Sequence, residues 1–305
     1  MLPYVLRRLL TSALTLLNIV LLSFLLMRLV PGGPFDHEKA LSPAVRKALE
    51  NRYGLADPIP VQLVRYLVGL LAGDLGPSLT QPDRTVNEIL ADGLPRSALL
   101  GGAALLVALL IGGLAGVYAA LRHNRLADHL AMGLVMLGVS IPSMVLAPLL
   151  VTLFALTLRW FPTSGWGTAG HVVLPALALG LAYAARIARL TRGGMLEALR
   201  QPHIRTARAK GLPEAAVVRR HALRLGIGPV LSYLGPATAS ILTGSFVIEQ
   251  IFDIPGMGRH FINGATSRDY TLALGTVIVY SALLILLNLA VDVAQAFLDP
   301  RIRLE

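Results

Sequence analysis

The chain has 305 residues, of which 55% are hydrophobic and 14% charged, and its formal net charge at pH 7 is +10. Uncharged runs of about 20 residues recur, each long enough to cross a hydrocarbon core of about 30 Å. This composition excludes an ordinary soluble domain and predicts an all-α polytopic integral membrane protein. The charge does not indicate nucleic-acid binding, because most of it lies in one loop, and the absence of Cys excludes disulfides and thiolate metal sites.

Six membrane-spanning helices are predicted. The first follows Arg7 and Arg8; it is longer than a signal-peptide core, and Pro31-Gly32-Gly33 is not a convincing cleavage site, so we expect a retained helix. In the third, Pro142 and Pro148 should cause a kink. The predicted segments are 9–30, 97–121, 129–158, 172–190, 225–248 and 270–297.

A small-xxx-small pair, Gly112 and Gly116, lies in the second predicted span. Such a pair permits close helix contact, although it also arises by chance in an apolar helix rich in Gly and Ala. In the fourth span, Arg186 and Arg189 leave only about 14 uncharged residues before them, so we expect this helix to continue beyond the membrane, with the Arg side chains reaching the interface.

The long segment between the first two spans, 31–96, predicts two helices. Ser42 suits an N-cap and Pro43 a first helical position, which favours a helix to about Tyr53. A second helix over 59–71 should lie along the outer membrane surface or against the bundle, either as a simple cover or as a docking surface. Its apolar face would be Ile59, Leu63, Leu67, Leu70 and Leu71, with Gln62 and Arg65 opposite.

The distribution of Lys and Arg predicts the orientation. The loop 186–224 holds ten Lys/Arg against Glu197 and Glu214, whereas 31–96 has seven against eight acids and 249–269 has two against three. Because excess Lys/Arg in short loops marks the cytoplasmic face, both termini and the loop 186–224 are expected inside.

Within this loop, residues 205–213 form a helix-forming run that is stopped by Gly211 and Pro213. Ala207 and Gly211 are four residues apart, which predicts that these small residues share one helix face and let it approach a groove closely. The run therefore predicts a docking element for a soluble partner.

Motifs for catalysis are absent from the sequence. None of Lys39, Lys47 and Lys210 follows a phosphate-binding glycine loop, and no zinc-protease helix motif or nucleophile elbow occurs, so the chain is not expected to be an ATPase, a protease or a metalloenzyme. A secondary transporter would need an acidic relay within the spans. Asp292, which shares a helix face with Asn288 and Gln295, is either a substrate contact or proton carrier, or a structural partner of a basic cytoplasmic residue. Its position near the helix end favours the structural role.

Several motifs together resemble the membrane subunits of peptide-importing ABC transporters. The B-type permease in particular is resembled by Arg28-Leu29-Val30-Pro31-Gly32. Among the B-type permeases, the oligopeptide member is favoured over the dipeptide, nickel-chelate and glutathione members by Gly73-Asp74-Leu75-Gly76-Pro77-Ser78. The resemblance covers essentially the whole chain. It also rests on 205–212, His221-Ala222-Leu223-Arg224, Ile254-Pro255-Gly256-Met257-Gly258, Arg268-Asp269-Tyr270 and Asp299-Pro300-Arg301.

The resemblance implies a type I ABC importer permease fold in the bacterial inner membrane, with an N-terminal part over 1–93 and a five-helix core over 94–305. It implies a homologous second permease, one or two cytoplasmic ATPases that carry ATP and magnesium, an extracytoplasmic peptide-binding protein and membrane lipid as partners, and no cofactor in this chain. The implied ATPase-coupling helix is Arg205, Thr206, Ala207, Arg208, Ala209, Lys210 and Gly211. Arg205 and Thr206 stand where the general importer motif has Glu and Ala, and Arg224 replaces an expected Pro.

Overall fold

The computed structural model describes residues 2–29 and 43–298. The described part is helical, and its only strand pairing is an isolated bridge between Pro77 and Thr85. The chain forms two compact units, and the chain passes from one to the other between Arg96 and Ser97, between Ile254 and Pro255, and between Leu286 and Leu287. The predicted division into 1–93 and 94–305 stays a prediction.

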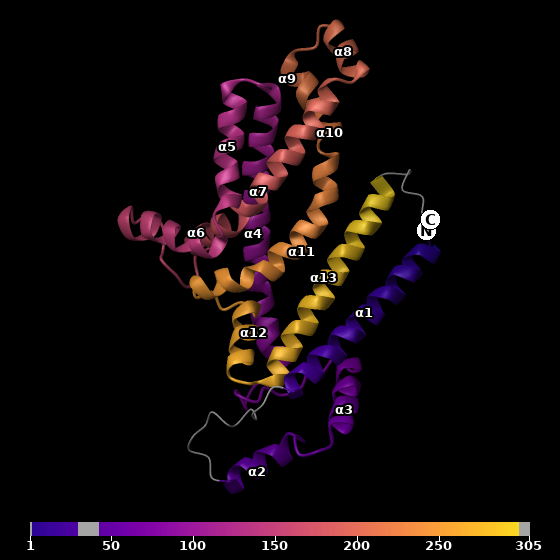
Figure 1. Cartoon of the computed structure of the whole chain (residues 1–305), viewed down its shortest axis with the longest axis vertical. Coiled ribbons are helices and arrows are strands. Elements are labelled where there is room, and N and C mark those ends of the chain that lie inside the picture. The colour runs from indigo at the N-terminus through magenta and orange to yellow at the C-terminus, as the bar shows by residue number, and fades with distance from the viewer. Residues whose placement is uncertain (1, 30–42, 299–305) are drawn as a thin grey trace. The chain divides into compact units, whose positions relative to one another are not determined.

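The first unit contains α1, α2, α3, the start of α4, α12 and the start of α13 (Figure 1). These helices are α1 (Leu2–Leu29), α2 (Pro43–Arg52), α3 (Ile59–Leu71), α4 (Val86–Leu121), α12 (Met257–Thr266) and α13 (Tyr270–Leu298). The two helices predicted between the first spans are therefore confirmed.

The second unit contains most of α4, the helices up to α11, and the end of α13 from Leu287. Their bounds are α5 (Leu126–Ser140), α6 (Ser143–Leu150), the π-helix η1 (Val151–Thr157), α7 (Ala169–Leu199), α8 (Pro202–Ala209), α9 (Glu214–Ala216), the π-helix η2 (Val217–Ala222), α10 (Leu223–Gly226) and α11 (Gly228–Ile251).

Within residues 2–29 and 43–298, four helices are long and apolar enough to cross a membrane, and two bent pairs bring the number to six if each pair is one span. The pair Leu126–Ser140 and Ser143–Thr157 is bent by 104°. This bend confirms the kink predicted at Pro142, because Pro lacks an N–H and keeps Ile141 extended, at φ −104° and ψ 119°. The continuation of α7 to Leu199 confirms that the fourth span extends beyond its apolar part.

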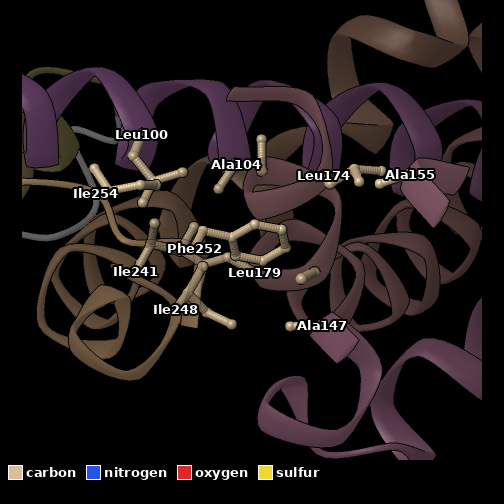
Figure 2. Packing of buried hydrophobic residues seen from close by; sticks show 12 residues of the cluster. Leu100, Ala104, Ala147, Ala155, Leu174, Leu179, Ile241, Ile248, Phe252 and Ile254 are labelled. Atoms are coloured by element: carbon tan, nitrogen blue, oxygen red, sulfur yellow. The ribbon is translucent and has the colours of Figure 1, made fainter. Parts of the chain in front are cut away.

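Buried apolar side chains from α4, α7 and α11 meet in the main core of the second unit (Figure 2). Leu100, Leu174, Ile241 and Ile248 in this cluster are fully buried. Burial of such side chains fixes the helices that carry the rest of the unit.

The close helix contact predicted at Gly112 and Gly116 is confirmed. A Cβ atom at Gly112 would lie 2.3 Å from the carbonyl oxygen of Ala184 in α7, and one at Gly116 would lie 2.6 Å from that of Ala188. Only glycine lets the backbones of α4 and α7 approach this closely.

In α3, one predicted face is wrong. Gln62 was expected opposite the apolar face, but it is buried, and its Nε2 donates hydrogen bonds to the carbonyl oxygens of Leu55 at 3.0 Å and Asp57 at 2.6 Å. The turn before α3 leaves these carbonyls without helical partners, and the glutamine amide satisfies them.

Candidate functional site

The predicted coupling segment is centred on α8, which lies beyond the ends of α7 and α10 (Figure 1). The helix begins at Pro202, earlier than the predicted Arg205, and ends at Ala209. Pro202 occupies the first helical position, where its missing N–H leaves no intrahelical bond unmade. Arg205, Thr206, Ala207, Arg208 and Ala209 are therefore helical, and Lys210 and Gly211 follow the helix.

Gly211 ends the segment through its backbone conformation. Its φ of +75° is left-handed, its N–H donates to the carbonyl of Arg208 at 2.9 Å, and the N–H of Leu212 donates to that of Ala207 at 3.3 Å. This pair of bonds is a Schellman motif, which satisfies the last carbonyls of α8 and favours glycine. The expectation that Ala207 and Gly211 share one helix face is wrong, because the helix stops between them.

Ala207 also faces its own chain rather than an open groove. Ile204 is fully buried and Ala207 is 6% exposed, in a cluster with Met195 of α7 and Val217 of η2. The outward surface of the segment consists of exposed residues: Arg205, Thr206, Arg208, Ala209 and Lys210. A partner would therefore contact a mainly cationic surface. The helix that carries this surface is held in place by the packing of Ile204 and Ala207 against α7 and η2.

An ion pair joins the predicted coupling segment to the helix that follows it. Arg208 donates from Nε to Oε2 of Glu214 at 3.0 Å and from Nη2 to Oε1 at 2.6 Å, which ties α8 to α9. Hydrogen bonding to Glu214 raises the pKa of the Arg208 guanidinium, so Arg208 remains charged. Arg205 and Lys210 supply the rest of the positive charge of this surface.

A buried ion pair that sequence reasoning missed joins α5 to α7. Asp128 is 1% exposed and accepts bonds from Nε and Nη2 of Arg192, both at 2.8 Å, and from the backbone N–H of Asn124 at 3.0 Å. Asp128 is the one acidic residue in the basic segment 122–128, and this isolated acid was the sequence feature that could have indicated an ion pair. The glycine contacts with α4, the ion pair with α5 and the cluster under α8 together hold α7 at several points along its length.

A second missed residue is Glu249. It was placed in the outer segment 249–269, but α11 continues to Ile251, so Glu249 is helical and fully buried. Hydroxyls of Ser97 and Ser245 each donate to its Oε1 at 2.7 Å. Asp292 belongs to α13 but lies outside the residues whose side chains are described.

Among the described residues, no three His, Cys, Asp or Glu side chains come together as a possible metal site.

Comparisons with known proteins agree with this description. The family model of the binding-protein-dependent transport system inner membrane component matches residues 112–304, and the model of its N-terminal part matches 1–95. The oligopeptide transport system permease protein OppB of Salmonella typhimurium is 52% identical over 305 residues, covering 99% of this chain and all of that protein. The dipeptide transport system permease protein DppB of Bacillus subtilis is 46% identical over 301 residues, covering 99% and 98%.

A solved structure of an amino acid ABC transporter has the same fold in part. It has a TM-score of 0.52 and 17% identity, and the match covers 71% of this chain and 95% of that chain.

Proposed function

Since the chain belongs to the family of binding-protein-dependent transport system inner membrane components, we propose that it is the B-type permease subunit of an ATP-driven oligopeptide importer. The 52% identity to an oligopeptide permease over the full length carries this proposal. The 46% identity to a dipeptide permease keeps dipeptides as the second substrate class.

The partners follow from this role. We expect a homologous second permease to complete the translocation path, one or two cytoplasmic ATPases to hold ATP and magnesium, and an extracytoplasmic protein to deliver the peptide. The permease itself sits in the inner membrane with both termini in the cytoplasm and hydrolyses nothing.

The mechanism relies on the connection between α8 and α7. When the ATPases close on ATP, a helix seated in one of them moves with it, and α7 transmits this motion because it is clamped to α4 by Gly112 and Gly116 and to α5 by the Asp128–Arg192 pair. Packed helices that move as rigid bodies then switch the path between inward and outward openings.

The test uses the exposed residue Ala209, because a bulky side chain there blocks docking without disturbing the core under α8. Ala209→Trp should reduce retention of the ATPase on the purified complex and peptide-stimulated ATP hydrolysis in lipid, since overpacking a fitted contact costs about 1–3 kcal/mol. The matched control is Leu126→Trp, at an exposed position at the start of α5, in the other segment expected on the same side. If Ala209→Trp keeps full retention and stimulated hydrolysis, α8 is not the coupling element.

A further inference from the structure

The first unit contains a cavity of about 400 Å³ between α1, α3, the loop after α3 and the start of α13. This volume lies in the range of small-ligand sites. Phe24, Tyr53, Tyr66 and Tyr270 contribute aromatic rings to its walls. Neither the coupling segment nor the proposed transport mechanism accounts for this cavity.

A cation lies at the cavity wall between two of these rings. The guanidinium carbon of Arg28 is 5.3 Å from the ring centroid of Phe24 and 5.2 Å from that of Tyr270. Its Nε is buried without a hydrogen-bond partner, and the described part of the chain supplies no carboxylate as an ion-pair partner. The aromatic faces stabilise the charge but accept no N–H hydrogen bond in the guanidinium plane.

Two more residues that line this cavity carry a buried polar atom that has no partner among the described residues. Gln62 is 8% exposed and donates from its Nε2 to backbone carbonyls, which leaves its Oε1 without a donor, and the hydroxyl of Tyr66 has no partner in the same part of the chain. Burial raises the pKa of Tyr66, so its hydroxyl stays protonated and able to donate. Each unpaired buried group costs about 1–3 kcal/mol, so two donors and one acceptor around one cavity indicate a bound anion that also carries a donor.

An apolar surface continues from this cavity along α3. Val68 lines the cavity and is 62% exposed, and Val64 and Leu71, on the same side of the helix at spacings of four and three residues, are 61% and 90% exposed. Arg28 lies one residue before the end of α1, which is also the end of the first candidate span, so its charge is expected at the membrane interface. A water-soluble anion would not cover such an apolar surface, whereas the acyl chain of a lipid would bury it.

We propose that this cavity binds the phosphodiester head group of a membrane phospholipid. Arg28 and Tyr66 donate to the phosphate oxygens, Gln62 accepts from a hydroxyl or ammonium of the head group, and an acyl chain covers Val64, Val68 and Leu71. The bound lipid would attach α3 to the end of α1 at the outer face of the membrane.

The experiment titrates the delipidated, purified transporter complex with phosphatidylglycerol and counts retained lipid by native mass spectrometry. Arg28→Gln and Tyr66→Phe should each weaken retention about tenfold, the loss expected for one charge-assisted hydrogen bond. Arg7→Gln, at the opposite end of α1, is the matched control and should retain lipid like the wild type. Thermal unfolding of each variant without lipid checks that the fold is intact. If Arg28→Gln fails to fold, Tyr66→Phe, which keeps the aromatic ring, tests the proposal by itself.

Competitors identify the source of the anion. Lipid retention should resist inorganic phosphate and tri-alanine at equal concentration. If phosphate alone displaces the lipid, the site takes a soluble anion, and if tri-alanine does so, the site takes a peptide carboxylate; either result overturns the proposal. Equal retention by the wild type and both variants overturns it as well.

Discussion

Buried carboxylates in this chain are stabilised in three different ways. Asp128 is paired with a guanidinium, Glu249 accepts from serine hydroxyls, and Asp269 caps α13. Asp269 is fully buried; its Oδ1 accepts from the N–H of Leu272 at 3.0 Å, and its Oδ2 accepts from the backbone N–H groups of Leu79 and Thr80 at 3.0 and 3.1 Å. A buried charge persists only with such compensation, so each of these acids fixes two distant segments together.

The contribution of such pairing is testable at Asp128. Asp128→Asn should lower the thermal stability of the detergent-purified protein, because weakening a charge-assisted hydrogen-bonded pair with one buried partner costs about 1–3 kcal/mol. The control is Asp92→Asn, which breaks an exposed pair with Arg84 and should cost about 0–1 kcal/mol. Equal shifts of the unfolding midpoint in both variants would show that the α5–α7 pair does not stabilise the unit.

At the scale of the helices, the contact between α4 and α7 is defined by neighbouring glycines with opposite surroundings. Gly112 faces the backbone of α7, whereas a Cβ atom at Gly113 would meet nothing within 4 Å. Gly112→Val should therefore destabilise the protein by about 1–3 kcal/mol or more, and it should also uncouple ATP hydrolysis from transport, since α7 loses its seat on α4. Gly113→Val makes the same change in composition and in helix propensity, and it is expected to be close to neutral. A similar loss in both variants would show that the close approach of α4 to α7 does not cause the effect.

Local patterns predicted the helices well and their partners poorly. The bounds of α3 and the break at Pro142 follow from propensity and from the chemistry of proline, which act within a few residues. Gln62 and Glu249 were misplaced because their partners lie in other segments, and only the folded chain brings these together. For the predicted coupling segment, the direction of Ala207 could not be predicted, since it depends on the underlying cluster from α4, α7 and η2.

At the scale of the whole chain, the remaining prediction is orientation. If each bent pair is one span, six spans place both termini on one side, and the excess of Lys and Arg in 186–224 predicts that this side is cytoplasmic. Loops after the first, third and fifth spans then lie outside. The coupling role of α8 requires this orientation, because ATP is available only in the cytoplasm.

Single cysteines test the orientation without background, because the chain has no cysteine of its own. Ser164→Cys, between the third and fourth spans, and Thr266→Cys, between the fifth and sixth, change exposed side chains and should react with an impermeant thiol reagent added outside intact cells. Gln201→Cys, at the start of α8, should react only after the membrane is permeabilised. Labelling of Gln201→Cys in intact cells, with protection at the other two positions, would place α8 outside. An outside α8 could not meet a cytoplasmic ATPase, so this result would contradict the proposed coupling role as well as the charge argument.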